Sequence, residues 1–411
     1  MSIDPVQTLD PSLGLVTESS LYAPNEVGLW RTMGLLASGA QPGARLSTAV
    51  GAFDLSRRSS LTRGAGEAVE RFALAPVPAD SPHLLAEAGS DQQRIDFVTA
   101  GLGRPSALAH DFPWYRATDL VTGTHTQVPA PLVDYDPGCG EWNPWDAFFD
   151  PSPNGAASGP SESFAQASAI AEVMERDAFL AAWRQRIPLH SFDAESMPVA
   201  VRQQPESRAL SLLLLTARAA GVQPTLAFIP TPGSPLLTAV CAIVEESGSA
   251  RFGAVGLKAA ADPVAALRGT LQEGLQIREL FLSRKQTARP DSMGTDMAVT
   301  DLAVTDDESR ADFWTTPPAI AELRQWVRSF EPSTFPSLQP APDAHALAKY
   351  LAKRDIGSHW VSLTHRLPVA IQELGWVAGK AICPGAIPLT MDETKGLFVM
   401  PGCSSIPHPL I

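Results

Sequence analysis

The stretches Glu67-Ala68-Val69-Glu70-Arg71 and Glu172-Val173-Met174-Glu175-Arg176 repeat one pattern: two glutamates three residues apart, followed by an arginine. Each lies in a run that predicts a helix, over residues 66–74 and 165–183, so the two carboxylates of a pair share one helical face. Taken alone, either copy is also typical of a solvated helix face. The second copy, however, is flanked on both sides by apolar residues, which indicates a buried helix.

Bringing the two helices together would gather four carboxylates. Mg2+ prefers such oxygen ligands and is usually held by a few carboxylates together with nucleotide phosphates. The arginine after each pair could contact phosphate oxygens in bidentate geometry. The paired stretches therefore predict a magnesium and nucleotide site. The predicted metal ligands are Glu67, Glu70, Glu172 and Glu175.

The composition is that of a large globular chain. Its 411 residues are 45% hydrophobic and 18% charged, which excludes a disordered protein. The net charge of −13 and a pI of about 5.1 disfavour nucleic acid or an anionic membrane as partner, because either requires a basic patch. We find neither a signal peptide nor an apolar run long enough to span a bilayer, and so expect a cytoplasmic protein. The four cysteines lack a Cys-x-x-Cys pair, and we expect buried free thiols.

Helical and strand patterns alternate along the rest of the chain, which predicts an α/β fold. The predicted helices cover 84–98, 210–220, 263–282, 320–330 and 344–353, and the predicted strands lie around 114–128 and at 224–230, 237–244, 252–257, 359–362 and 377–382. Residues 1–411 are expected to form one domain. The polar stretch 287–310 predicts a mobile insertion. Residues 404–411 predict an extended tail, since Pro-His-Pro cannot enter a helix.

Common nucleotide motifs such as Gly-x-x-x-x-Gly-Lys-Ser/Thr are absent. Gly66 to Arg71 instead looks like the first glutamate motif of the YcaO family, ATP-dependent enzymes that modify peptide backbones. Asn154-Gly155-Ala156-Ala157-Ser158-Gly159, followed by Glu172 to Phe179, resembles the second motif of that family.

Two further segments extend the resemblance. Residues 256–262 and the following helix with Glu273, Gln276 and Arg278 are similar to the third YcaO motif. Cys383-Pro384-Gly385 and Pro407-His408-Pro409 resemble the end of the azoline-forming branch. Each motif is weak alone, but their order and spacing over residues 10–411 are specific.

The resemblance implies an α/β fold in which the two glutamate helices meet at an ATP and Mg2+ site. It also implies a reaction on a ribosomally made precursor peptide. A Cys, Ser or Thr side chain attacks the preceding backbone carbonyl, ATP phosphorylates the resulting oxygen, and a thiazoline or oxazoline forms with ADP and phosphate. The ATP-binding residues so implied are Glu67, Glu70, Arg71, Glu172, Glu175, Arg176, Gln276 and Arg278. The tail residues Pro407, His408 and Pro409 are implied to reach the catalytic site.

Four features depart from the family pattern. Gly64 stands where a small hydroxyl residue is common, Pro160 where a polar residue is common, and Phe164 where a glutamate is common. The tail ends Pro-Leu-Ile rather than Pro-x-Pro. A charge-assisted contact contributes about 1.5–3 kcal/mol, so each loss predicts roughly 10-fold weaker binding or more. The alternatives are a degenerate scaffold or partner subunit, and a YcaO enzyme that forms a thioamide or amidine.

The partner predictions follow from what the sequence lacks. We find neither a tetra-cysteine zinc site nor an evident leader-binding module. We therefore expect a precursor peptide as substrate and a separate leader-peptide-binding protein as partner. A homodimer is compatible with the sequence.

Overall fold

The computed structural model describes residues 3–37, 49–76, 93–135, 144–193, 197–246, 250–287 and 302–411. Two compact units are distinguished by their internal contacts. Unit 1 comprises Met1–Asn25, Leu29–Met174 and Pro342–Leu389, and unit 2 comprises Glu26–Gly28, Glu175–Ala341 and Thr390–Ile411. A single domain over residues 1–411 stays a prediction.

The first glutamate motif lies in unit 1, on a helix that covers a three-stranded antiparallel sheet. The strands β1 (Val16–Tyr22), β2 (Trp30–Leu36) and β3 (Ala49–Asp54) pair in that order. Helix α2 (Arg57–Leu74) packs on β2 and β3, and Ser56 caps its N-terminus by accepting the N–H of Ser59. Short helices α1 (Pro5–Thr8) and η1 (Pro11–Leu13) precede the sheet.

Unit 1 contains a second antiparallel sheet, in the order β5-β4-β12-β13-β6. Its strands are β4 (Trp114–Asp119), β5 (His125–Pro129), β6 (Ala156–Gly159), β12 (His359–Ser362) and β13 (Val377–Ile382). The described helices of this part are α3 (Ala130–Val133), α10 (Ala344–Ala352), α11 (Val369–Glu373), η3 (Pro105–Ala109) and η7 (Thr364–Arg366). The structure confirms the strands predicted near 114–128 and at 359–362 and 377–382.

Unit 2 is built on a five-stranded sheet in the order β10-β9-β8-β7-β11. Its strands are β7 (His190–Phe192), β8 (Thr225–Phe228), β9 (Leu237–Glu245), β10 (Phe252–Ala260) and β11 (Glu331–Pro332). Only the pair formed by β7 and β11 is parallel among the described strands. Among the described strands β10 therefore lies at the edge of the sheet, where its Gly253 N–H donates to the Trp314 carbonyl at 2.9 Å.

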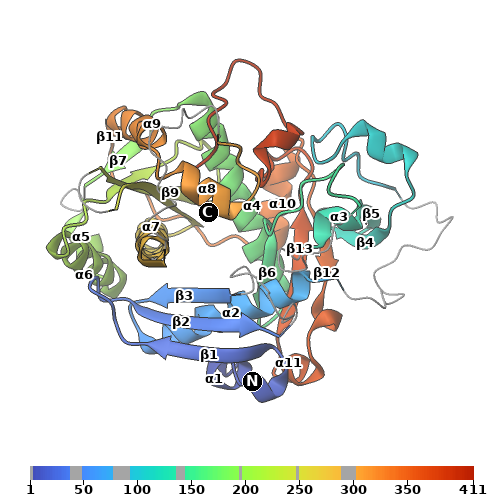
Figure 1. Ribbon diagram of the computed structural model, residues 1–411, viewed down its shortest axis with the longest axis horizontal. Helices are drawn as coiled ribbons and strands as arrows, with labels where there is room; N and C mark the ends of the chain where they lie inside the picture. Colours follow the sequence, from blue (N-terminus) through green and yellow to red (C-terminus); the bar gives the residue numbers. More distant parts are fainter. Residues whose placement is uncertain are drawn as a thin grey trace. The chain divides into compact units, whose positions relative to one another are not determined.

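Helices cover both faces of this sheet (Figure 1). Helix α7 (Pro263–Thr287) lies so close to β10 that a Cβ at Gly256 would come within 2.2 Å of the Gly274 nitrogen. Helix α9 (Pro317–Arg328) contacts the opposite face, where Gly253 meets Leu323. Helices α5 (Val199–Arg202), α6 (Pro205–Ala219), α8 (Asp307–Phe313) and η8 (Glu393–Lys395) complete this unit.

The second glutamate motif lies on the longer helix α4 (Glu162–Gln185). Residues Glu162 to Met174 of α4 are assigned to unit 1, and Glu175 to Gln185 are assigned to unit 2. The predicted helix over 165–183 is thus confirmed, and so is the predicted helix over 66–74 within α2.

The predicted helix over 84–98 is wrong where the structure describes it. Residues 84–92 lie outside the described residues, whereas 93–98 form a bridge and a turn. Arg94 pairs with Gln127 through the backbone, and its guanidinium lies 4.4 Å from the centre of the Trp114 ring. These contacts with the strand pair replace the local helical hydrogen bonds.

The predicted insertion over 287–310 is described only at its ends. Residues 288–301 lie outside the described residues. Residues 307–310 begin α8, whose N-terminus carries a capping box between Asp306 and Ser309. The mobility of the insertion stays a prediction.

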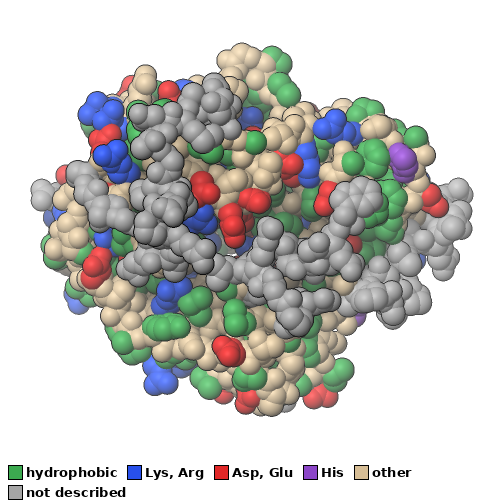
Figure 2. Space-filling model, in the orientation of Figure 1, with side chains coloured by type: hydrophobic (Ala, Val, Ile, Leu, Met, Phe, Trp, Pro, Cys, Tyr) green, Lys and Arg blue, Asp and Glu red, His purple; other side chains and the backbone are tan. Residues whose placement is uncertain are grey.

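The described residues include surface charges of both signs and three cysteines. Lys and Arg side chains on the face drawn in Figure 2 are interspersed with acidic and apolar ones. None of the helices in the described part of the chain is long and apolar enough to cross a membrane. Cys241 and Cys383 are buried and outside any disulfide among the described residues, Cys403 is partly buried, and Cys139 lies outside the described residues.

Candidate functional site

Two glutamates of unit 2 accept hydrogen bonds from backbone N–H groups of the edge strand β10. An Oε of Glu175 accepts the N–H of Ala259 at 2.5 Å, and an Oε of Glu273 accepts the N–H of Leu257 at 2.8 Å. Alternate N–H groups of a strand point to the same side, so the two carboxylates are held next to each other. The donors are neutral backbone groups, which fix the carboxylates without cancelling their charge.

The electrostatics of this pair favour a cation. Burial, and then the negative charge of Glu175, raise the pKa of Glu273 to about 7. The Leu257 N–H, Arg176 and Lys258 act in the opposite direction but do not offset this effect. A bound cation would relieve the repulsion between two adjacent carboxylates, and oxygen ligands of this kind suit Mg2+.

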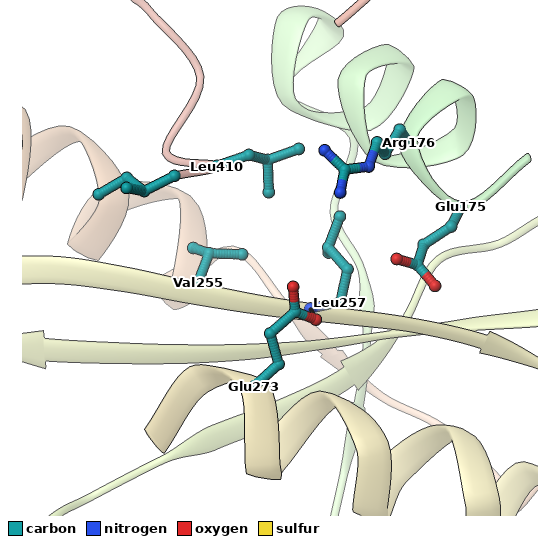
Figure 3. Close-up of a pocket in the computed structure, with 7 residues that line it drawn as sticks. Glu175, Arg176, Val255, Leu257, Glu273 and Leu410 are labelled. Carbon is teal, nitrogen blue, oxygen red and sulfur yellow. Dashed lines mark hydrogen bonds between the residues drawn. The ribbon is translucent and has the colours of Figure 1, made fainter. Parts of the chain in front are cut away.

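These carboxylates face a small pocket that is partly open to solvent. Figure 3 shows the carboxylates of Glu175 and Glu273 and the guanidinium of Arg176 directed into one space, with Leu410 of the tail beside it. The pocket is lined by Glu175, Arg176, Val255, Leu257, Glu273, Leu410 and Ile411. Helix α4, strand β10, helix α7 and the C-terminal tail thus all contribute to it.

The C-terminal tail is ordered against unit 2. His408, Pro409 and Leu410 are buried, Pro407 is partly buried, and the segment has neither helix nor strand. The Nε2–H of His408 donates to the Thr390 carbonyl at 2.9 Å, and its Nδ1 accepts the N–H of Leu410 at 3.3 Å. Burial, and then Arg310, hold the pKa of His408 well below its usual value, so the ring is neutral.

The first glutamate motif lies on α2 in unit 1. The Nε of Arg71 lies 2.9 Å from an Oε of Glu67, the i,i+4 geometry expected on a helix. Burial alone would lower the pKa of Arg71, but the carboxylates of Glu67 and Glu70 raise it above its ordinary value. The Ser158 hydroxyl donates to the Gly66 carbonyl at 2.8 Å, and this joins the first motif to the glycine-containing start of the second.

A buried lysine near Glu172 is a charged group that we did not predict. Lys380 on β13 is 1% exposed, and its Nζ donates to the carbonyls of Ser152 at 2.6 Å and Val133 at 3.3 Å. Burial lowers its pKa to about 7, although Asp134 and Glu172 act to raise it. The signal in the sequence is a lysine inside an apolar strand, because a buried lysine must find partners.

Two departures from the family pattern have local structural reasons. A Cβ at Gly64 would lie 2.7 Å from the Thr32 methyl group, so Thr32 takes the space of a side chain at position 64. The Phe164 ring lies over Gly159, within 2.2 Å of where a Cβ would be. The first turn of α4 does carry a carboxylate, since Glu162 accepts the indole N–H of Trp360 at 3.0 Å.

The remaining predicted ligands lie on α7. Gln276 is partly exposed and follows Glu273 by three residues, so the two share a helical face. Arg278 lies 2.7 Å from Glu26 and 2.8 Å from Glu279. Its predicted contact with phosphate stays a prediction.

The predicted four-glutamate site involves both units. Glu67, Glu70 and Glu172 belong to unit 1, and Glu175 belongs to unit 2. No group of three or more His, Cys, Asp or Glu residues in the described ranges forms a metal site by itself. The four-glutamate metal site stays a prediction.

The sequence matches the model of a protein family over residues 54–387. That family is the YcaO cyclodehydratases, described as ATP- and Mg2+-binding. The chain belongs to the YcaO family. This confirms the family resemblance and the predicted cofactors ATP and Mg2+.

Solved structures share the fold at low sequence identity. A heterocyclase in complex with substrate and cofactor matches with a TM-score of 0.69 and 17% identity; the match covers 100% of this chain but 57% of that one. YcaO from Methanopyrus kandleri, bound with AMPPCP and Mg2+, matches with a TM-score of 0.63 and 17% identity over 95% of this chain and 93% of that one. The E. coli microcin synthetase McbBCD complex matches with a TM-score of 0.58 and 14% identity over 89% and 87%. No curated protein sequence matches. These matches confirm the α/β YcaO-like fold.

Proposed function

We propose that this chain is an ATP-dependent cyclodehydratase subunit that acts on a ribosomally made precursor peptide. A Cys, Ser or Thr side chain adds to the preceding backbone carbonyl carbon, and the former carbonyl oxygen leaves, so that a thiazoline or oxazoline forms with net loss of water. When bound, ATP with Mg2+ supplies the phosphoryl group that makes this oxygen a leaving group, giving ADP and phosphate.

The observation that carries the proposal is the pair of carboxylates, Glu175 of α4 and Glu273 of α7, that is hydrogen-bonded to β10 next to Arg176. Glu175 and Glu273 offer oxygen ligands held by the N–H groups of Ala259 and Leu257, and their mutual repulsion disfavours the empty state. Mg2+ binds through one or two carboxylates and completes its shell with phosphate oxygens and water, so this donor set fits it. Arg176 in the same pocket has the geometry and permanent charge that suit phosphate.

The residues of unit 1 have related roles in the proposal. Glu67, Glu70 and Glu172 supply further carboxylates, and Arg71 keeps its positive charge at any physiological pH because its pKa is raised. Gln276 and Arg278 extend the nucleotide contacts along α7. The residues Pro407, His408 and Pro409 bring the end of the chain to the pocket.

We propose further that a separate protein presents the leader part of the peptide. Two structural relatives support this assembly, because one is a complex named McbBCD and the other is a heterocyclase with substrate bound. The present chain spans 57% of the length of that heterocyclase, which leaves room in the relative for a part that this chain does not match.

The decisive experiment measures ADP release and peptide mass together. The protein is incubated with ATP, Mg2+, a Cys-, Ser- and Thr-rich peptide encoded by a neighbouring gene, and the adjacent partner protein. We expect peptide-dependent ADP release and the loss of one water mass per ring. ADP release with exchange of oxygen for sulfur in the peptide would indicate a thioamide instead. No ADP release under any condition would contradict the enzyme function and favour a non-catalytic scaffold.

The first prediction concerns Glu175. Glu175→Gln keeps an acceptor for the Ala259 N–H but removes the charge, and we expect turnover to fall roughly 100-fold while peptide binding is unchanged. The matched control is Glu246→Gln, at an exposed ion pair with Arg324. Turnover equal to that of the control would contradict a role for Glu175 in the chemistry.

A further inference from the structure

A fully buried arginine of α8 is bound to the tail. The Arg310 side chain is 0% exposed, and its guanidinium lies 3.1 Å from an Oε of Glu393. It donates to the carbonyls of Thr390 at 2.6 Å, Met391 at 3.1 Å and His408 at 3.1 Å. A buried charge is costly unless it is paired and hydrogen-bonded, and the groups around Arg310 meet both conditions.

His408 is fixed through both its backbone and its ring. Its carbonyl accepts a second hydrogen bond, from the indole N–H of Trp314 at 3.0 Å. Its ring donates to Thr390 and accepts from the N–H of Leu410. Both ring nitrogens are thus engaged in hydrogen bonds within the protein. The hydrogen bond from the Leu410 N–H also sets the direction of the residues that follow His408.

The tail before His408 is attached to α4 and to the turn that follows it. The N–H of Ser404 donates to the Arg184 carbonyl at 2.8 Å, and the Ser404 hydroxyl lies 3.1 Å from the Arg186 guanidinium. The indole N–H of Trp183 donates to the Ile406 carbonyl at 3.2 Å. The tail is therefore held at residues 404, 406 and 408, and only the last residues extend into the pocket of Glu175 and Glu273.

From these contacts we propose that Arg310 is a positioning residue that holds Leu410 and Ile411 in the pocket. This inference rests on the function proposed above and adds the residue through which the tail is set for the reaction. His408 belongs to the same anchor. A displacement of about 1 Å at a reacting centre can cost roughly 100-fold in rate, so loss of the anchor should lower kcat rather than weaken ATP binding.

The central test is a double-mutant cycle between Arg310→Met and deletion of residues 408–411 in the full chain. Each single change should lower kcat for ring formation by about 10-fold to 100-fold and change KM for ATP less than about twofold. Because Arg310 acts through the tail, the double variant should be no slower than the deletion alone. Multiplicative losses in the double variant would overturn the proposal.

A second measurement does not depend on activity. Carboxypeptidase should release Ile411 slowly from the wild-type protein and at least about tenfold faster from Arg310→Met, at a temperature where both remain folded. Arg324→Met, which removes an arginine from an exposed ion pair on α9, is the control and should match the wild type. Equal release from Arg310→Met and the control would also overturn the anchor.

Trp314→Phe serves if Arg310→Met does not fold. It removes one hydrogen bond to the His408 carbonyl and preserves an aromatic ring next to Trp183 and Phe313. We expect the same pattern with a smaller loss of kcat, and wild-type kcat together with wild-type release of Ile411 would contradict the proposal. If the wild type makes no ring, the proposed function fails, while the release of Ile411 still decides whether Arg310 anchors the tail.

Discussion

The acidic residues of the two units are held in different ways. In unit 1, Glu67 is paired with a full positive charge on the same helix, since Arg71 lies 2.9 Å away. In unit 2, Glu175 and Glu273 are held by the N–H groups of one strand, and their charges repel each other. The same residue type is therefore internally compensated in one place and poised for an outside cation in the other. Whether a carboxylate can serve a cation depends on what fixes it, and the number of glutamates in a motif does not reveal this.

A second contrast concerns the two buried arginines. Arg366 of unit 1 donates to the carbonyls of Ala73, Leu74 and Ala75, which end helix α2. Arg310 of unit 2 donates to carbonyls of the 390–391 segment and the tail. One arginine thus caps a helix that carries glutamates, as favoured by the helix dipole, and the other anchors a segment without regular structure.

The largest effect on stability is expected at Arg366. Its guanidinium also lies 2.7 Å from Asp134, so Arg366→Met would remove one buried charged donor from a carboxylate and three carbonyls. We expect the free energy of unfolding to fall by about 3–5 kcal/mol, measured by urea denaturation. Arg324→Met, at an exposed pair, should cost less than about 1 kcal/mol. Equal losses in the two variants would show that other contacts hold the end of α2.

An intermediate effect is expected from pH at Glu273. Its pKa is about 7 in the folded protein and 4.5 without the fold, so its contribution to stability is present below pH 4.5 and is lost as the pH rises to 7. Glu273→Gln stays neutral at every pH. Relative to wild type, the variant should therefore gain up to about 3 kcal/mol between pH 4.5 and 7.5, measured by urea denaturation with a chelator.

Lys380 in unit 1 is a control, because its contribution to the free energy of unfolding should change with pH in the opposite direction. Its pKa is lowered from 10.5 to about 7, so wild-type stability should gain a contribution as the pH rises from 7 to 10.5. Lys380→Met should lack this gain. It should keep the wild-type change in the free energy of unfolding between pH 4.5 and 7, which is assigned to Glu273. If the free energy of unfolding of Glu273→Gln changed with pH in the same way as that of the wild type from pH 4.5 to 7.5, the repulsion assigned to the acidic pair would be refuted.

The smallest effect is expected at Glu67. Glu67 and Arg71 are each about one-third exposed, so Glu67→Gln should cost less than about 1 kcal/mol in the free energy of unfolding. The cost should shrink further in high salt because the pair is screened. A salt-independent loss well above this value would mean that unit 1 holds its carboxylate as tightly as unit 2 does.

The sequence predicted the parts of the site that depend on neighbours along the chain. Helices α2 and α4 follow from apolar spacing, and the contact of Arg71 with Glu67 follows from the i,i+4 geometry of a helix. Strands β12 and β13 were predicted at their observed bounds, residues 359–362 and 377–382.

The rest depends on contacts between distant segments, which local patterns do not encode. Glu273 belongs to the third motif, but nothing in its spacing predicts that Glu175 lies beside it on β10. Arg310 lies in a stretch expected to be mobile, and Arg366 is the last residue of the short 3-10 helix η7. Their partners are backbone carbonyls, which every residue has, so no sequence signature marks them.

The position of β10 at the edge of its sheet has a consequence for the behaviour of the folded protein in concentrated solution. An unpaired strand edge is a template on which another chain can add a strand, with risk of association or aggregation. Glu175 and Glu273 occupy two successive hydrogen-bonding positions there, and they place negative charge where an incoming backbone would have to dock. The residues that collect charge in the pocket thereby also protect this protein from intermolecular β-pairing.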